Sequence, residues 1–236
     1  MSEDHTPRAG SERVMRRHSA NRTLALVATA VFVLAPIAIA AQQAASSQAA
    51  RTATLHERTK AAGGRLTEAV PDEGESPCAT LAELAARSPL IVIGEVLAHR
   101  AHLASDQARV TTDVVVKVQE RVRGPVAAGA LITVTMPGGS YRFPDGAIVH
   151  QPRPGYRPIR DRARYLLFLR ESRPRTIVRG TVAYELALGP QGQFELDFEK
   201  DAVTPAAGER SHPLASRYGG LRIRQLLTEL HAAVPR

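Results

Sequence analysis

The sequence is short of several residue types that often carry chemistry. Its 236 residues include one cysteine, no tryptophan and only 4% aromatic residues. A single cysteine, Cys78, excludes an intrachain disulfide and a metal site built from several cysteines. We interpret Cys78 as a small apolar residue, with a disulfide to another chain as the alternative. The scarcity of aromatic rings argues against a platform that stacks nucleic-acid bases.

Lysine is also scarce, so arginine supplies nearly all of the positive charge. The three lysines are Lys60, Lys117 and Lys200, and the formal net charge is +8. Abundant alanine together with arginine in place of lysine is typical of a GC-rich genome. The basic balance is therefore weak evidence for a nucleic-acid or anionic-surface partner.

An uncharged apolar segment, residues 24–41, follows an arginine-rich segment, residues 1–23. Residues 38–40 read Ala-Ile-Ala, a small-x-small pattern typical of signal-peptide cleavage. Eighteen apolar residues also lie at the lower limit for a membrane-spanning helix. We expect either a signal peptide cleaved near Ala40 or an uncleaved single-pass anchor. Both place the basic end in the cytoplasm and the remaining chain outside it, in the periplasm or secreted.

Residues 42–75 predict a flexible linker, because their apolar residues keep no sustained period. A short helix near residues 54–62 is possible within it. After the linker, Ser76-Pro77 resembles a helix start, and we expect a short helix over residues 78–87.

The clearest strand pattern lies at residues 109–124, where valines and a threonine alternate with polar residues. A period of two predicts a strand with one buried face. The preceding run, Leu90-Ile91-Val92-Ile93, is apolar on both faces and predicts a strand covered twice, with a bulge at Gly94. We expect that strand to end near His99 and a polar excursion to follow it.

Further strands are predicted at residues 132–136, 164–170, 176–188 and 193–199, and an amphipathic helix at residues 221–234. The remaining residues, 140–162 and 201–218, read as loops. The fold class is therefore mainly β: a small closed or nearly closed barrel of about five to seven strands, with a short helix before it and an amphipathic helix after it. We assign the barrel domain to residues 76–200 and a packed C-terminal loop and helix to residues 201–236.

Several segments resemble a poorly characterised group of exported bacterial domains. Residues 88–96 are similar to a strand reading IVxGxV, and residues 118–125 to a strand end reading VxExLKGP. The segments ITV and PGG at residues 132–139, YLLFL at 165–169 and GQF at 192–194 extend the resemblance over roughly residues 80–200. It implies an OB-like β-barrel and, more distantly, the barrel of netrin and metalloproteinase-inhibitor modules.

The chain departs from that pattern at residues 161–164, where Asp-Arg-Ala-Arg replaces a turn reading xxGE. Metalloproteinase inhibitors of this type depend on a network of cysteines, which one cysteine cannot supply. The resembling motifs are turns and core strands, so the resemblance implies a fold and no reaction.

The loop at residues 140–162 is the region where we expect contacts with a partner, because arginine and tyrosine together suit protein surfaces, carboxylates and phosphates. A long loop inside a small domain is often functional, although a merely solvated loop is the alternative. Its candidate contact residues are Tyr141, Arg142, Arg153, Tyr156, Arg157, Arg160 and Arg162.

Other polar groupings predict no site. His99, His102 and Asp106 could bind a metal only if a turn brought them together, and we interpret them as exposed loop residues. The acidic row Glu195, Asp197 and Glu199, with Glu185 across from it, reads as a solvated strand face. Ser140 lacks the G-x-S-x-G spacing of a nucleophile elbow, and no serine, histidine and aspartate are spaced as a triad. We predict no catalytic residues, metal or cofactor.

Two functions remain as hypotheses. The first is a non-enzymatic extracytoplasmic binding module, secreted or membrane-tethered, whose partner is a protein or an envelope polymer. The second is an OB-like barrel that binds a polyanion or nucleic acid, with export arguing against nucleic acid. The sequence predicts neither the partner's identity nor the oligomeric state.

Overall fold

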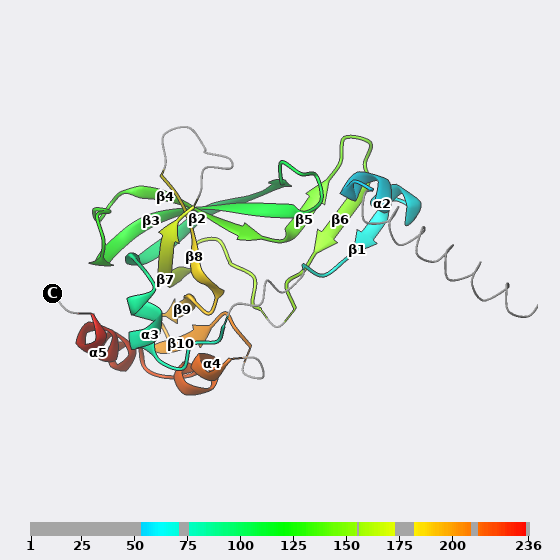
Figure 1. The fold of residues 1–236 in the computed structure, drawn as a ribbon. Coiled ribbons are helices and arrows are strands. Elements are labelled where there is room, and N and C mark those ends of the chain that lie inside the picture. Colours follow the sequence, from blue (N-terminus) through cyan, green and yellow to red (C-terminus); the bar gives the residue numbers. More distant parts are fainter. Residues whose placement is uncertain (1–52, 71–75, 155, 173–181, 209–211, 235–236) are drawn as a thin grey trace, which may run out of the picture. The chain divides into compact units, whose positions relative to one another are not determined.

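Two β-sheets and four short helices make up the part of the chain that the structure describes (Figure 1). The structure is a computed structural model and describes residues 53–70, 76–154, 156–172, 182–208 and 212–234. All of them belong to one unit, Ala53–Arg236. The mainly β class is confirmed. The strands are β1 (Arg65–Thr67), β2 (Leu90–Leu103), β3 (Val110–Arg123), β4 (Leu131–Pro137), β5 (Gly139–Arg142), β6 (Ile148–Gln151), β7 (Arg164–Glu171), β8 (Val182–Pro190), β9 (Gln193–Asp197) and β10 (Ala202–Pro205).

Five strands of the larger sheet pair in a closed cycle, which we call the ring. The order is β7, β2, β3, β4 and β8, and β8 pairs again with β7. All neighbours are antiparallel except β4 and β8, which are parallel. β9 pairs with β7, and β10 continues the sheet from β9.

Apolar side chains cover the ring strands on both faces. Inside the ring lies one buried cluster, which includes Val92, Val116 and Leu167. A second, outer cluster takes Ile91 and Phe168 from the opposite faces of β2 and β7 and packs them under helices α3 (Leu81–Ala86), α4 (Pro213–Tyr218) and α5 (Ile223–Ala233). The expectation of a doubly covered strand at residues 90–93 is confirmed.

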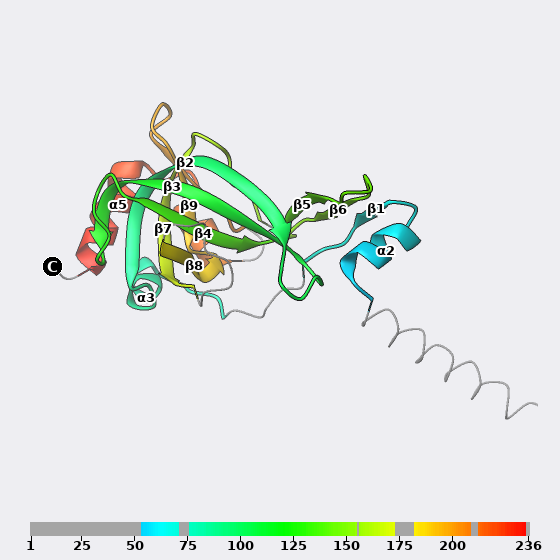
Figure 2. The ribbon, with the colours of Figure 1, turned by 90° about the horizontal axis from the view of Figure 1, so that it is seen from above.

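β2 and β3 are long neighbouring strands (Figure 2), and β3 alternates as the sequence predicts from Val114 to Val118. The pattern differs at Asp113, one of the expected polar positions, which is 7% exposed and accepts a hydrogen bond from the Thr135 hydroxyl.

The register between β2 and β3 shifts at Gly94, where a Cβ would lie 2.4 Å from Val116 Cγ1, so glycine permits the close approach. β2 continues to Leu103, past the predicted end near His99. The reason is that residues 99–103 pair with Val110–Val114 of β3, and Ala101 and Leu103 pack against a buried cluster that includes Val110.

The second sheet, which we call the small sheet, has the order β1-β6-β5. β1 pairs in parallel with β6, and helix α2 (Leu55–Ala61) packs beside it with Leu55 fully buried. The expected linker at residues 42–75 therefore contains folded elements over residues 55–67. The helix anticipated near residues 54–62 is α2, capped by Thr54 and Glu57.

Three other predicted elements differ in detail. Helix α3 begins at Leu81 and not at Cys78, because the side chain of Thr80 caps it by accepting a hydrogen bond from the backbone N–H of Glu83. The predicted loop at residues 201–218 contains β10 and α4, and the predicted loop at residues 140–162 contains β5 and β6. The C-terminal helix packs its apolar stripe, including Leu226 and Leu230, into the outer cluster.

Cys78 precedes α3 and is 2% exposed. Burial raises the pKa of its thiol. A disulfide to another chain would therefore require this segment to move.

None of the helices in the described residues is both long enough and apolar enough to cross a membrane. The predicted signal peptide or anchor, residues 24–41, and the basic segment before it lie outside the described residues.

Candidate functional site

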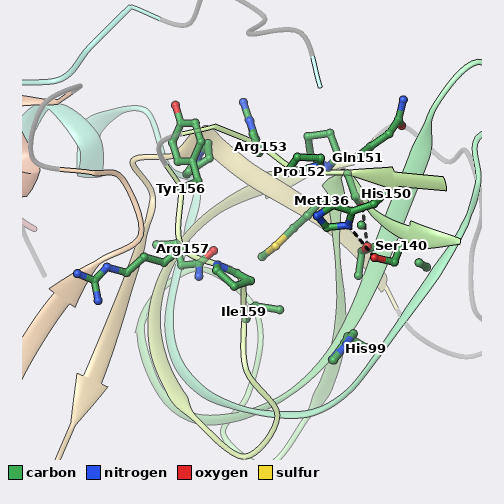
Figure 3. Close-up of a pocket in the computed structure, with 18 of the residues that line it drawn as sticks. His99, Met136, Ser140, His150, Gln151, Pro152, Arg153, Tyr156, Arg157 and Ile159 are labelled. Atoms are coloured by element: carbon green, nitrogen blue, oxygen red, sulfur yellow. Dashed lines mark hydrogen bonds between the residues drawn. The ribbon is translucent and has the colours of Figure 1, made fainter. Parts of the chain in front are cut away.

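A pocket of about 710 Å³ opens where the ring meets the small sheet (Figure 3). That volume lies within the range of small-molecule sites. Its lining comes from the C-terminal part of β2, Thr112 of β3, the junction of β4 and β5, the end of β6 with the loop that follows, Leu186 of β8, and two residues at the turn between β8 and β9. The lining residues used below are His99, Arg100, Thr112, Met136, Pro137, Gly138, Gly139, Ser140, His150, Arg153, Tyr156, Arg157, Ile159 and Leu186.

Two consecutive glycines form the wall at the junction of β4 and β5. Gly138 and Gly139 have φ values of +95° and +130°, which favour glycine strongly. A Cβ on Gly138 would lie 2.7 Å from the carbonyl oxygen of Gln151, and the Thr112 hydroxyl donates a 2.7 Å hydrogen bond to the carbonyl of Gly138. The glycines therefore let the chain leave the ring and start the small sheet within two residues.

The pocket has an apolar floor that continues into the ring. Leu186 belongs to the cluster inside the ring, and Met136 and Ile159 are partly buried against it. Figure 3 shows the Met136 side chain pointing toward the middle of the ring, with Ile159 below it. The floor can therefore bury an apolar part of a ligand without rearrangement of the core.

Among the described residues of the lining, the charged ones are all basic: Arg100, Arg153 and Arg157, with His99 and His150 also present. Elsewhere in the described chain several arginines are paired with carboxylates, among them Arg170 with Glu185 at 2.6 Å and Arg217 with Glu229 at 2.8 Å. No described residue of the lining is an aspartate or glutamate, so the field of these residues favours an anion.

Arg153 is held in place by an aromatic ring. Its guanidinium carbon lies 4.9 Å from the ring centroid of Tyr156, a cation–π contact. Within the described residues its buried Nε has no hydrogen-bond partner. The Tyr156 hydroxyl is 3.0 Å from Nε2 of His212, which fixes the ring in turn. Arg153 is thus oriented by stacking, which leaves its Nε donor uncommitted.

The loop that carries Tyr156 is docked on the segment after β10. Tyr156 forms an isolated bridge with Ala207, and the backbone N–H of Arg157 donates a 2.8 Å hydrogen bond to the carbonyl of Ala206. Figure 3 shows the Arg157 side chain extending away from the ring. Arg157 therefore contributes to the charge around the pocket more than to its interior.

A serine and a histidine face each other at the pocket edge. Ser140 on β5 and His150 on β6 are cross-strand partners, and Ser140 Oγ lies 2.8 Å from His150 Nδ1. Both residues are exposed, and among the described residues no carboxylate bonds to His150. A catalytic serine needs its histidine oriented by a third group and needs donors for the oxyanion. We interpret their contact as a cross-strand hydrogen bond that stabilises the β5–β6 hairpin.

The seven candidate contact residues are divided by the structure. Arg153, Tyr156 and Arg157 line the pocket. Tyr141 packs edge-on against Phe143 in the small sheet, and Arg142 is exposed on β5. The remaining two lie in the loop before β7, where Arg160 pairs with Glu195 and the backbone N–H of Arg162 donates to the carbonyl of Val96.

The structure also shows the partners of the histidines and acidic residues that the sequence analysis considered as metal ligands. His99 lies 2.8 Å from Asp161, and His102 lies 3.7 Å from Asp113, so the two histidines have different partners. The acidic residues are used in ion pairs: Glu185 with Arg170, Glu195 with Arg160 and Asp197 with Lys200. Over the described residues, no three histidine, cysteine or carboxylate side chains gather as a metal site.

Sequence reasoning missed Arg100, His150, Met136 and Leu186 as pocket residues. They come from different strands, and no spacing in the sequence joins them. One signal was present for the hairpin that carries His150: Pro144-Asp145-Gly146, a turn sequence, stands between short alternating segments.

Comparisons of the chain with protein-family models, with curated proteins and with solved structures give no match.

Proposed function

We propose that this chain is a non-enzymatic, extracytoplasmic binding module and that the pocket between the ring and the small sheet is its binding site. The observation that carries the proposal is the lining, whose described residues include basic side chains and no carboxylate, above an apolar floor. A concave, largely apolar site with a few convergent polar groups is the usual form of a ligand site. The extracytoplasmic location comes from residues 24–41 of the sequence.

We infer that the ring is an OB-like barrel. The support is its closed cycle of five strands, in which one parallel pair, β4 with β8, closes an otherwise antiparallel sheet. The OB-fold is a five-stranded Greek-key barrel. This chain adds β9 and β10 beyond β7 and inserts β5 and β6 between two ring strands. A kinship with netrin and metalloproteinase-inhibitor barrels would be distant, since their cysteine network has no counterpart here.

Site-specific photocrosslinking in native cells tests the binding function. A benzophenone amino acid replaces Pro158, an exposed residue of the pocket lining, and in the control it replaces Phe198, a residue that is 49% exposed and does not line the pocket. We expect discrete adducts from position 158 and none of the same mass from position 198. No adduct from position 158, or equal adducts from both positions, would contradict the assignment of the pocket.

The same protein tests whether the module is non-enzymatic. A hydrolytic activity of the purified full-length chain that is lost in Ser140→Ala and kept in Arg142→Gln would overturn this part of the proposal. Ser140 and His150 would then have to be interpreted as a catalytic pair.

The location has its own test, the intact mass of the protein recovered from fractionated native cells. A mass beginning near Ala41 in soluble extracytoplasmic material is the expected result for a cleaved signal. A full-length mass in the membrane fraction is the expected result for a single-pass anchor. A full-length mass in the cytoplasmic fraction would contradict export.

Polyanion binding is the second candidate function, and the unpartnered Arg153 Nε together with Arg100 and Arg157 favours it. Contacts with a polyanion release counterions, so affinity should fall steeply with salt. Nucleic acid remains the less favoured polyanion, because the described residues of the lining include one tyrosine and no phenylalanine or tryptophan for stacking.

A further inference from the structure

We propose that the pocket binds an amphipathic ligand with one anionic head group, a carboxylate or a phosphate monoester, on an apolar body. Arg153 would hold the head, and Met136, Ile159 and Leu186 would cover the body. This inference rests on the proposed function, because it names the class of ligand for the same pocket.

The apolar floor argues for a ligand with a body. Met136 and Ile159 are only partly buried, although they pack against the buried cluster inside the ring. Covering them removes apolar surface from water, which favours binding. Methionine is unbranched and adapts its shape, so one floor can accept chains that differ somewhat. A polyanion without apolar parts would leave this surface uncovered.

The position of Arg153 argues for a single head group. Its guanidinium is planar and matches the oxygens of a carboxylate or phosphate in a bidentate way. The contact with Tyr156 and the bond from Tyr156 to His212 fix the plane before a ligand arrives. In Figure 3, Arg153 points upward beside Tyr156, away from Met136 and Ile159, and Arg157 extends away from the ring. The two arginines therefore do not form a continuous track through the interior of the pocket, and Arg153 is placed for a head group at its rim.

Nearby charges agree with an anionic head. Two described carboxylates beside the lining have basic partners and are not part of it: Asp161 lies 2.8 Å from the lining residue His99, and Glu195 is paired with Arg160. Arg100 and His150 are further polar residues of the lining. Among the described lining residues, an anion placed at Arg153 therefore meets basic groups and no carboxylate.

Titration calorimetry on the full-length chain tests the inference with five probes below their micellar concentrations where they form micelles. Decanoate and decyl phosphate carry both parts, decanol carries the body alone, inorganic phosphate the head alone, and a short polyphosphate is the polyanion. We expect decanoate or decyl phosphate to bind at least about tenfold more tightly than decanol or inorganic phosphate, the scale of one charged hydrogen-bonding group. Which of the two binds better distinguishes a carboxylate ligand from a phosphate ligand.

Three variants assign the effect to residues. Arg153→Gln should reduce the affinity for decanoate and decyl phosphate to that for decanol, and Arg153→Lys should restore only part of it because the planar fork is lost. The matched control is Arg142→Gln, an exposed arginine on β5 outside the pocket, which should bind like the wild type. Thermal unfolding of each variant verifies the fold, and titration of each probe into the same buffer without protein corrects for partition of the probes into detergent or lipid.

Each other result overturns the inference in a distinct way. Equal affinity for decanol and decanoate would show that the anionic head group does not contribute to binding. The pocket would then be a site for apolar ligands only. Tighter binding of polyphosphate, with a steep salt dependence, would support the second candidate function instead. No binding of any probe would refute this ligand class, while the crosslinking result at position 158 would still decide the proposed function.

Discussion

The ring and the small sheet are stabilised in different ways. The ring strands lie between two buried clusters, one inside and one beneath the helices, and Phe168 and Leu167 on adjacent positions of β7 face opposite clusters. The small sheet has five buried apolar residues, contributed by α2, the start of β3 and the β5–β6 hairpin. Since apolar burial is the main favourable term in folding, the ring should be the last part to unfold.

Polar contacts contribute a larger part of the stabilising interactions in the small sheet than in the ring. Asp145, in the turn between β5 and β6, lies 2.9 Å from Nε2 of His56 and 3.0 Å from Nζ of Lys60, both on α2. Arg58 of α2 pairs with Glu68, and the His56 ring stacks on Phe143 with centroids 4.3 Å apart. Such exposed pairs contribute little each, so the small sheet should open locally while the ring persists.

The largest expected effect belongs to the ring. Phe168→Ala removes a side chain that is fully buried and packs edge-on against Phe194. We expect a loss of about 3–5 kcal/mol in the global free energy of unfolding, measured by urea denaturation. The control Phe198→Ala, at an exposed position, should lose less than about 1 kcal/mol. Similar losses in both variants would contradict the packing described for β7.

A smaller and local effect is expected in the small sheet. Phe143→Ala removes a residue that is 4% exposed and contacts His56 and Tyr141. Hydrogen exchange should accelerate in residues 55–67 and 139–151 by roughly one to two orders of magnitude, while the urea midpoint of the ring shifts little. An equal loss of protection in β2 and β7 would show that the two regions unfold together. It would contradict the proposed difference in stability between the ring and the small sheet.

The smallest effect concerns acid pH. Hydrogen bonds from Lys60 and His56 lower the pKa of Asp145 from its ordinary value of 3.8. Its contribution to stability is therefore present above the ordinary pKa and is lost as the pH falls through the lowered one. Exchange protection of α2 should decrease below about pH 4 in low salt, and Asp145→Asn should weaken this pH dependence.

Glu57 is a second acidic residue of the small-sheet region that should contribute to the same pH dependence. Hydrogen bonds from Thr54 lower its pKa as well, so it contributes in the same direction. Asp145→Asn should leave a residual pH dependence, which Glu57→Gln in the same chain removes. A pH dependence unchanged by both substitutions would mean that other groups govern the small sheet in acid.

The strands of the ring were predictable from sequence where burial leaves a pattern. Valine alternation at residues 110–118 predicts β3, and the short apolar run at residues 165–169 predicts β7, because one-sided and two-sided burial select different patterns. The apolar residues at 90–93 likewise predict a strand covered on both faces. These inferences need only local periodicity.

The small sheet was harder to predict, because its strands are three or four residues long. So few residues give little alternation, and the parallel pairing of Arg65 with Ile148 joins segments far apart in the sequence. The Pro144-Asp145-Gly146 turn was the usable signal. The pocket shows the same limit. Nine of its lining residues lie in the predicted contact loop, residues 140–162, and three of these were predicted as contact residues. Apart from residues 136–139, the other lining residues come from strands and turns that are far from the loop in the sequence.

The dual pairing of β8 has a consequence for biosynthesis. Val182–Leu186 contains the residues that pair with β4 and with β7, so both strands keep an unpaired edge until this segment joins them. Ribosomes add about 5–20 residues per second, and a nascent chain that ends before residue 182 cannot yet close the ring. Open strand edges template association with other chains. A premature stop codon between β7 and residue 182 should therefore produce a fragment that aggregates and is bound by chaperones or degraded by proteases. It should not produce a smaller functional domain.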